Sequence, residues 1–438
     1  MNRMVENGKT LLVDGPASVT VTLGKVEVFG FTLGNTKKVV IREGKRLPFV
    51  VEEKATLNIS LGESANIEEI DGSTIPQSWI KSSEEILKLQ TKPVTAIVLG
   101  TVDSGKTSFC TYLINKLLNE KKKVAFLDGD LGQSDIGPPC TIAYTFVTKP
   151  TTDLFNLQAK NAFFVGVTSP STAINKVIEG LTSLKTEILG DNPDLIVIDT
   201  DGWVEGEDAV NYKVQLVGEL NPDIIFCIQQ KDELTTLLNA LEKFRRITVD
   251  FPSAIKQRSR EKRKSLRELG YMKYLRNAKV QSLPLSWLKI EENELLGFGR
   301  AHENINQANK IYNILGMKPL HSAELEDRVC IVIGRRRWIN EDSIKKLEEI
   351  AKKKIRVIRK GEEEGLLIAL YNAERKFLGI GILHEVDYAR KTIKIFTPVS
   401  EKISIIALGK VKLDKNLKET SAFTEENQLE FAGFSEFF

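Results

Sequence analysis

The stretch Val94–Thr107, VTAIVLGTVDSGKT, decides the fold of this chain. Its apolar and β-branched first half predicts a buried strand over Val94–Leu99. The second half, Gly100–Thr107, matches G-x-x-x-x-G-K-[ST] at every fixed position. A helix with one apolar face is expected directly after it, over Thr107–Leu118. A strand, a glycine-rich loop and a helix in this order predict a phosphate-binding loop.

The chemistry of such a loop depends on its backbone and on two side chains. Glycine lets the backbone curl so that its N–H groups point at phosphate oxygens, and the start of the following helix adds a favourable dipole. Lys106 is expected to reach the β- and γ-phosphates, and the Thr107 hydroxyl to bind Mg²⁺. The residues expected to bind the nucleotide are consecutive: Gly100, Thr101, Val102, Asp103, Ser104, Gly105, Lys106, Thr107 and Ser108. The later segment 229–232, QQKD, does not match the Asn-Lys-x-Asp pattern of GTPases, which favours ATP.

The rest of the central region alternates short apolar runs with helical stretches. Strands are expected over residues 124–127, 163–165, 195–198 and 224–228, and helices over 173–184, 209–220 and 233–244. This alternation predicts an α/β domain over residues 88–279, with a parallel sheet covered on both faces.

Strand-rich regions flank this domain on both sides. Residues 1–87 alternate apolar and polar side chains and predict an all-β, sandwich-like domain, in which no chemical motif is visible. A connecting helix is expected over Ser82–Leu89, capped by Ser82 or Ser83. Residues 280–438 predict a β-rich C-terminal domain, interrupted by a helix over Glu341–Ala351 with its N-cap at Asn340.

Composition sets the broad class of protein. The 438 residues are 42% hydrophobic and 28% charged, with a mean hydropathy of −0.16, which excludes a disordered chain and a membrane bundle. The apolar runs are too short to span a bilayer, and residues 1–10 contain no secretory signal. Four scattered cysteines indicate reduced thiols in an intracellular, cytoplasmic protein.

Carboxylates follow two of the predicted strands. Asp128 and Asp130 come after the strand at 124–127, and Asp199 ends the strand at 195–198, as in a Walker B motif. The carboxyl ends of parallel strands meet at the ligand-binding edge of such a sheet. Carboxylates there could hold Mg²⁺, for which Asp128 and Asp199 are the candidates beside Thr107, or accept a proton from an attacking hydroxyl. Capping of a turn is the simpler alternative for each.

Two further features could meet a nucleic acid. Trp203 lies four residues after Asp199, where it could stack on a base or simply pack in the core. Residues 256–279 hold ten Lys or Arg and two Glu, although the formal net charge of the chain is only +3. Arginines there could cover a transferring phosphoryl group or hold a nucleic-acid backbone, and a solvated helix face is the alternative. Two more basic runs, Arg335–Arg337 and Lys352–Lys360, are surface candidates or plain solvated charge.

The order of these motifs resembles that of one known family. The loop Gly100–Thr107 is followed by Asp128-x-Asp130-x-Gly132-Gln133, by Phe163-Phe164-x-Gly166 with Ser169-Pro170, by Thr200-x-Gly202-Trp203 and by the basic segment. The chain is similar to the polynucleotide 5′-hydroxyl kinases of RNA processing, which include the kinases of tRNA-splicing, pre-mRNA cleavage and pre-rRNA-processing complexes. The resemblance extends to the layout of three domains and thus over nearly the whole chain.

The resemblance implies a role for each matching residue. Lys106 and Thr107 would bind ATP and Mg²⁺, and Asp130 would be the base for the 5′-hydroxyl of the RNA. Gln133 would lie near the attacking group or the metal. Thr200, Gly202 and Trp203 would clasp the terminal nucleotides. Arg263 and Arg267 would form the lid over the phosphates, with Arg260 as an alternative.

The expected reaction is therefore transfer of the γ-phosphate of ATP to the 5′-hydroxyl end of RNA. DNA as a second acceptor, protein partners in RNA processing and the oligomeric state are left open. One alternative is a catalytically silent, ATP-bound scaffold, which would not need Lys106 or the basic segment. The other is an NTPase switch, which would not need a base for an alcohol.

Overall fold

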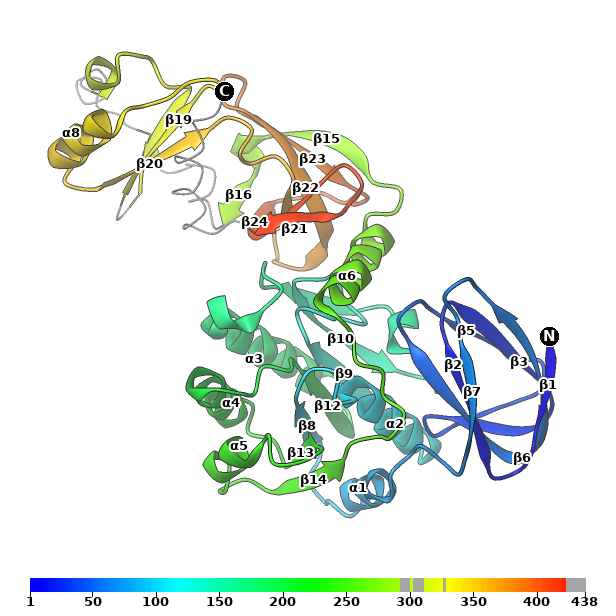
Figure 1. Cartoon of the computed structure of the whole chain (residues 1–438). Helices are drawn as coiled ribbons and strands as arrows, with labels where there is room; N and C mark the ends of the chain where they lie inside the picture. Colours follow the sequence, from blue (N-terminus) through cyan, green and yellow to red (C-terminus); the bar gives the residue numbers. More distant parts are fainter. Residues whose placement is uncertain (292–299, 302–310, 326–327, 423–438) are drawn as a thin grey trace. The chain divides into compact units, whose positions relative to one another are not determined.

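The structure, a computed structural model, describes residues 1–291, 300–301, 311–325 and 328–422 (Figure 1). The chain divides into two compact units, residues 1–270 and 271–438. In the described residues, no helix is both long enough and apolar enough to cross a membrane.

The first unit begins with a seven-stranded sheet in which every pairing is antiparallel. Its core forms because alternate side chains of the two longest strands point inward, as Val19, Val21, Leu57 and Ile59 do. The strands are β1 (Asn2–Val5), β2 (Lys9–Asp14), β3 (Ala17–Val28), β4 (Phe31–Leu33), β5 (Lys38–Ile41), β6 (Arg46–Leu61) and β7 (Ile67–Asp71). The predicted all-β character of the N-terminal region is confirmed.

The connecting helix starts earlier than expected. Helix α1 spans Gln77–Leu87 and follows Pro76, so the predicted cap at Ser82 or Ser83 is wrong. Both hydroxyls lie inside the helix and donate to carbonyls one turn back. The early start brings Trp79 into the interior, where its ring packs edge-on against that of Phe109, 5.2 Å away.

The second sheet of this unit carries the phosphate-binding loop. Its strand order is β11-β10-β9-β12-β8-β13-β14. The strands are β8 (Val94–Gly100), β9 (Val124–Gly129), β10 (Thr141–Val147), β11 (Asn161–Phe164), β12 (Leu195–Thr200), β13 (Ile224–Gln229) and β14 (Arg246–Asp250). Five strands pair in parallel, while β10, next to the edge strand β11, pairs antiparallel with both β9 and β11. The predicted P-loop fold is confirmed, but a purely parallel sheet is wrong because the sequence did not reveal β10.

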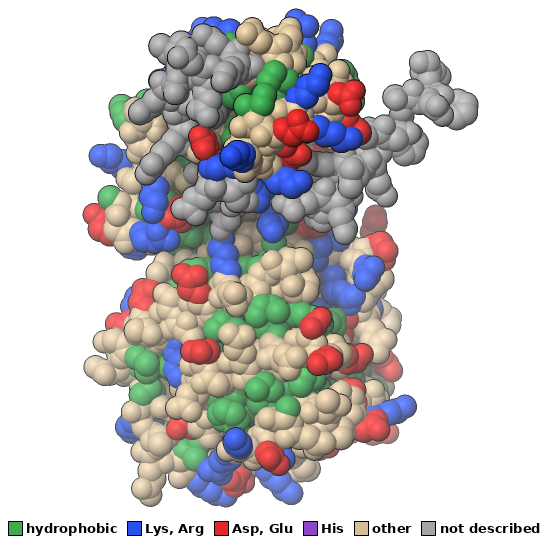
Figure 2. All heavy atoms as spheres, turned by 90° about the vertical axis from the view of Figure 1, so that its left-hand side faces the viewer, with side chains coloured by type: hydrophobic (Ala, Val, Ile, Leu, Met, Phe, Trp, Pro, Cys, Tyr) green, Lys and Arg blue, Asp and Glu red, His purple; other side chains and the backbone are tan. Residues whose placement is uncertain are grey.

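Helices cover both faces of this sheet, as predicted. These helices are α1, α2 (Lys106–Asn119), α3 (Ile174–Gly190), α4 (Glu207–Leu220) and α5 (Thr235–Ala240), and a further helix, α6 (Arg260–Tyr274), follows β14. Figure 1 shows α1 and α2 on one face and α3, α4 and α5 on the other. On the latter side, charged side chains of both signs lie scattered among hydrophobic patches (Figure 2). Helix α5 is shorter than the predicted 233–244.

In the second unit, the described residues form two further sheets. One has the order β15-β23-β22-β21-β24-β16, with β25 beside β24, and the other the order β17-β18-β19-β20. The strands are β15 (Lys279–Pro284), β16 (Lys289–Glu291), β17 (Arg300–Ala301), β18 (His321–Glu324), β19 (Arg328–Ile333), β20 (Lys354–Arg359), β21 (Leu366–Tyr371), β22 (Phe377–Asp387), β23 (Thr392–Thr397), β24 (Ile405–Leu413) and β25 (Glu419–Ala422). Helix α8 (Glu341–Ala351) joins β19 to β20, and Asn340 caps it by accepting a hydrogen bond from the Ser343 N–H, as predicted.

Candidate active site at the phosphate-binding loop

The phosphate-binding loop joins β8 to α2. Helix α2 begins at Lys106, directly after Gly105, whose φ of +93° favours glycine. The Lys106 ammonium is almost fully buried and donates to the carbonyl oxygen of Thr101 at 2.8 Å. The Ser104 hydroxyl is completely buried and has no hydrogen-bond partner in the described part of the chain. A buried cation and an unsatisfied hydroxyl on one loop fit the oxygens of a bound phosphate.

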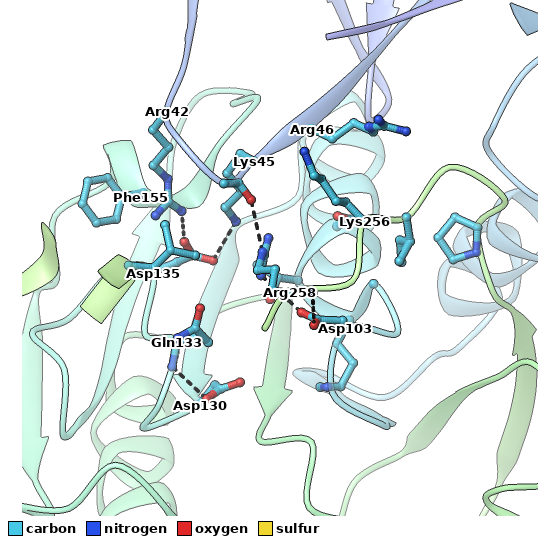
Figure 3. Close-up of a pocket in the computed structure, with 18 of the residues that line it drawn as sticks. Arg42, Lys45, Arg46, Asp103, Asp130, Gln133, Asp135, Phe155, Lys256 and Arg258 are labelled. Carbon is cyan, nitrogen blue, oxygen red and sulfur yellow. Dashed lines mark hydrogen bonds and ion pairs between the residues drawn. The ribbon is translucent and has the colours of Figure 1, made fainter. Parts of the chain in front are cut away.

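A cavity of about 150 Å³ opens at this loop (Figure 3). It is lined by the phosphate-binding loop, by the loop after β9, by residues 252–258, by the middle of α6, and by the β5–β6 turn of the first sheet. The lining includes the predicted residues Lys106, Thr107, Ser108, Asp130, Gln133 and Arg267. Side chains predicted from three separate motifs therefore meet at one cavity.

Asp130 lies on the wall of this cavity. Its Oδ1 accepts hydrogen bonds from the backbone N–H groups of Gly132 at 2.9 Å and Gln133 at 3.0 Å, which fixes the carboxylate (Figure 3). Burial raises the pKa of Asp130 above its usual value, while the Lys106 ammonium opposes the shift. A carboxylate with a raised pKa is a better proton acceptor, so Asp130 is suited to the role of base.

Asp128 organises the loop that carries Asp130. Its Oδ2 accepts from the backbone N–H of Asp135 at 2.7 Å and of Ile136 at 3.2 Å, and from the Ser134 hydroxyl at 3.1 Å. Its Oδ1 accepts from the Asp130 N–H. Burial first, and then the neighbouring carboxylates, raise the pKa of Asp128 well above its usual range. The carboxylate predicted as a metal ligand is thus engaged in holding residues 130–136.

Asp199 lies at the end of β12, beside the phosphate-binding loop. Its Oδ2 accepts the Thr107 hydroxyl at 2.6 Å. Burial raises the pKa of Asp199 to about 6, against the opposing effects of the Lys106 charge and the Thr107 hydrogen bond. A threonine hydroxyl and a carboxylate in contact are the oxygen ligands that Mg²⁺ takes beside phosphates. The pair Thr107 and Asp199 therefore fits a magnesium ion.

The segment after β12 approaches the phosphate-binding loop closely. A Cβ on Gly202 would lie 2.6 Å from the backbone nitrogen of Val102, so only glycine fits there without a shift. Thr200 is buried and its hydroxyl donates to the Val98 carbonyl within the sheet. Trp203 is half-buried and stacks on Tyr212, with ring centroids 5.7 Å apart and 24° between the planes.

A buried cluster that the sequence did not reveal fixes this segment. The Tyr212 hydroxyl and the Lys213 ammonium each donate to Asp201 Oδ2 at 2.8 Å, and the backbone N–H of Trp203 donates to Asp201 Oδ1. Burial lowers the pKa of Lys213, and the Asp201 charge opposes that shift. The cluster therefore holds the backbone at Trp203 and the Tyr212 ring on which its indole stacks.

Most of the basic segment forms helix α6, which begins at Arg260. Arg263 Nη1 lies 3.2 Å from Asp103 Oδ2, and the backbone N–H of Arg258 donates to the same oxygen at 2.9 Å. Arg267 lines the cavity, whereas Arg260, the first residue of α6, is exposed. The Gln133 amide donates to the Arg263 carbonyl at 3.2 Å. The arginines thus lie against the phosphate-binding loop, and Arg258 joins the pair singled out from the sequence.

The N-terminal sheet also reaches the cavity, which corrects the expectation that residues 1–87 carry no chemical feature. Arg42 and Lys45, at the β5–β6 turn, both pair with Asp135 (Figure 3). Arg42 also binds Asp153 through two nitrogens and lies 4.1 Å from the Phe155 ring centroid. The signal that could have revealed this turn is its run of three cations within residues 42–46.

Comparisons with known proteins agree with this architecture. A family described as "mRNA cleavage and polyadenylation factor CLP1 P-loop" matches residues 100–277. The match spans the phosphate-binding loop, the motif around Asp130, the segment at Trp203 and helix α6.

Two archaeal proteins resemble the chain over most of its length. A protein of Methanocaldococcus jannaschii named polyribonucleotide 5′-hydroxyl-kinase is 30% identical over 338 residues, which cover 76% of this chain and 91% of that protein. A protein of the same name from Pyrococcus abyssi is 26% identical over 356 residues, covering 80% and 96%.

A solved structure of Clp1p in complex with Pcf11p (454–563) shares the fold. Its TM-score with this chain is 0.66 at 14% identity, and the match covers 94% of this chain and 97% of the solved one. The similarity therefore extends to the strand-rich regions on both sides of the phosphate-binding loop.

Proposed function

This chain belongs to the polyribonucleotide 5′-hydroxyl-kinase family with the CLP1-type P-loop domain, and we propose that it transfers the γ-phosphate of ATP to the 5′-hydroxyl end of RNA. One observation supports this reaction most directly. A single cavity is lined by the loop lysine Lys106, by a fixed carboxylate at Asp130 and by the arginine Arg267. Phosphoryl transfer needs these three elements: a phosphate cradle, a group that accepts the hydroxyl proton, and cations over the transferring group.

Each residue of this set has a role that its surroundings support. The backbone of the phosphate-binding loop and Lys106 would hold the β- and γ-phosphates. Asp130 would accept the proton of the 5′-hydroxyl as the O–P bond forms, and its raised pKa suits that task. Arg267 and Arg263 would stabilise the charge on the equatorial oxygens. Mg²⁺, held by Thr107 and Asp199, would neutralise charge between the phosphates.

The half-buried Trp203 supports an acceptor that contains bases. Its ring stacks on Tyr212, and its backbone N–H donates to Asp201, so the tryptophan is positioned before any substrate binds. Stacking of a base on an aromatic ring contributes about 1–3 kcal/mol. We propose that Trp203 holds the terminal nucleotide, with Gln133 close to its hydroxyl. DNA as an acceptor, partners in RNA processing and an intracellular location stay predictions.

The test is transfer of label from γ-³²P-ATP in the presence of Mg²⁺. The acceptors are a 20-nucleotide RNA with a 5′-hydroxyl, the same RNA with a 5′-phosphate, and DNA of the same sequence. We expect label on the 5′-hydroxyl RNA and none on the 5′-phosphate RNA. Lys106→Ala should abolish transfer, and Arg267→Ala should lower its rate by more than tenfold with little change in ATP affinity.

Measurement of ADP release in the same reactions distinguishes the two alternatives, the NTPase switch and the silent scaffold. An NTPase switch would release ADP at the same rate with and without the 5′-hydroxyl RNA. A silent scaffold would bind ATP yet release no ADP under either condition. Absence of label on the 5′-hydroxyl RNA at saturating ATP would contradict the proposed reaction.

A further inference from the structure

One exposed surface of the second unit contains none of the residues to which the proposed reaction assigns a role. Strands β19 and β20 are parallel neighbours, with Ile333 paired to Arg359 at their carboxyl ends. The chain leaves β19 through Gly334 and then presents four consecutive exposed side chains: Arg335, Arg336, Arg337 and Trp338. Together with Arg359 these four residues form what we call the Trp338 patch. Its charge lies within a basic region, since residues 335–360 contain eleven Lys or Arg and four Asp or Glu.

Trp338 is the unusual member of this patch. Its side chain is 67% exposed, although indole is a large apolar group that proteins usually bury. The Arg359 guanidinium lies 4.0 Å from the centre of its ring, at a stacking distance. The tryptophan is therefore oriented by an arginine and remains open to a ligand.

The loop that carries these side chains is held in place from below. The Arg337 N–H donates to the Gly334 carbonyl at 3.0 Å, which closes a turn. Ile339 packs against the core formed by residues such as Ile331 and Leu347. The exposed side chains are consequently presented by an anchored turn.

The positive charge of the patch is only partly neutralised. Arg335 lies 3.6 Å from Glu364, and Arg359 lies 3.4 Å from Glu362. Within the part of the chain that the structure describes, no carboxylate pairs with Arg336 or Arg337. Two neighbouring arginines are thus available for anionic groups.

We infer that the Trp338 patch is a second RNA-binding site, which holds single-stranded RNA away from its 5′ end through phosphate contacts to Arg336 and Arg337 and stacking of a base on Trp338. Single-stranded RNA offers both the phosphates and the splayed bases that this combination matches. An acidic peptide would use the arginines and leave the exposed indole without a partner, so RNA fits the patch better.

This inference rests on the proposed function for its substrate class. A polynucleotide kinase acts on a chain end, whereas the rest of the substrate extends beyond the cavity at the phosphate-binding loop. A second contact would raise the affinity for long acceptors without any change at the reacting hydroxyl.

The test measures binding of fluorescein-labelled RNA to the full chain by fluorescence anisotropy. The probes are a 20-nucleotide and a 4-nucleotide RNA, both with a 5′-phosphate, so that binding is read without turnover. Trp338→Ala should weaken binding of the 20-mer roughly tenfold, and Trp338→Phe should retain most of it. Binding of the 4-mer should change by less than about twofold in either variant. The double variant Arg336→Ala/Arg337→Ala should also reduce the slope of log K against log salt by about 1.4.

Matched controls come from the same unit. Trp287 is 69% exposed and Arg390 carries an 85% exposed side chain, so Trp287→Ala and Arg390→Ala remove an equally exposed indole and guanidinium elsewhere. Neither substitution should weaken binding of the 20-mer by more than about twofold. The thermal midpoint of each variant is recorded, and Trp338→Phe separates loss of stacking from a local structural change.

Three results would overturn this inference. Unchanged 20-mer binding by Trp338→Ala, or equal weakening by Trp287→Ala, overturns the inference. Competition by poly-glutamate as strong as that by an RNA of equal charge would also overturn it, because it would indicate an acidic protein partner.

The transfer and binding measurements together distinguish failure of the proposed function from failure of this inference. If the wild type transfers no label but its 20-mer binding depends on Trp338, the reaction is wrong and the RNA site stands. If transfer occurs and 20-mer binding is independent of Trp338, the proposed reaction stands and the second RNA site is wrong.

Discussion

At the scale of single residues, Gly202 decides how closely the end of β12 approaches the phosphate-binding loop. A methyl group there would lie 2.6 Å from both the Val102 backbone nitrogen and its Cγ2, so the loop has to move. We expect Gly202→Ala to weaken ATP binding by about fivefold or more, since overpacking typically costs about 1–3 kcal/mol. Isothermal titration calorimetry measures this affinity. Gly218→Ala is the control, because a Cβ there meets nothing within 4 Å, and an equal loss of affinity in that variant would contradict the argument.

Asp130 gives a second prediction at this scale. Asparagine keeps the size of the side chain and the oxygen that accepts from Gly132 and Gln133, but it cannot take up the proton. Asp130→Asn should therefore lower kcat by about 10²–10⁴ and leave the Kd of ATP within about threefold. The exposed Asp232→Asn is the control. A variant whose kcat stays within tenfold of the wild type would show that another group accepts the proton.

The pH dependence of kcat follows from the same carboxylate. Burial raises the pKa of Asp130, so the acid form persists to a higher pH than in an ordinary aspartate. A base acts only when ionised, and kcat should therefore rise with pH through this raised pKa. The rise should be absent from the residual activity of Asp130→Asn. A pH–rate profile at saturating ATP and RNA measures it, and an identical profile in wild type and variant would contradict the assignment.

At the scale of elements, Asp103 connects the phosphate-binding loop to helix α6. It accepts from Arg258 and Arg263, 155 and 160 residues further along the chain. Asp103→Asn removes the charge from this contact and should loosen residues 256–267. We expect trypsin to cut this segment about five to ten times faster in the ATP-free variant, as local opening becomes more frequent. Mass spectrometry of the fragments measures it. Asp71→Asn, at a 94% exposed side chain, should leave the rate unchanged, and equal rates in all three proteins would contradict the contact.

The same contact illustrates what the sequence could predict. The phosphate-binding loop and its flanking elements follow from local patterns, because a strand, a helix and their connecting glycines lie within 26 residues of one another. The pairing of Asp103 with Arg258 does not follow from local patterns, because a charge pattern indicates that a cation needs an anion but not which anion. Strand β10 was missed for a related reason: its antiparallel partner β9 lies across an eleven-residue loop.

Helix α1 shows how a local signal can mislead. Ser82 and Ser83 are residues that favour the start of a helix, and Glu85 follows them. In the structure their hydroxyls bond back to carbonyls of the preceding turn, because burial of Trp79 draws the helix start to Gln77. Packing against Phe109, thirty residues away in sequence, thus decides a boundary that capping propensity alone places too late.

At the scale of the whole first unit, a buried charge network joins the N-terminal sheet to the P-loop sheet. Arg42 comes from the β5–β6 turn, while Asp135 and Asp153 belong to segments that flank β10. Burial alone would raise the pKa of Asp153, but the charges of Lys45 and Arg42 and the hydrogen bonds from Arg42 outweigh it and lower this pKa to about 2. The two sheets are therefore expected to unfold together.

Removal of Arg42 tests this coupling. Arg42→Ala leaves two buried carboxylates with reduced compensation, and it should lower the free energy of unfolding at pH 7 by about 3–5 kcal/mol. Because the folded pKa of Asp153 is lowered, its contribution to stability is present above the unfolded pKa, near 4, and is lost as the pH falls towards 2. The difference in the free energy of unfolding between wild type and Arg42→Ala should therefore be smaller at pH 3 than at pH 5, as measured by urea unfolding. Lys54→Ala, which breaks a pair with Glu6 in which both side chains are more than half exposed, should cost less than about 1 kcal/mol. An equal deficit at both pH values, or two separate unfolding transitions in the wild-type first unit, would contradict the coupling.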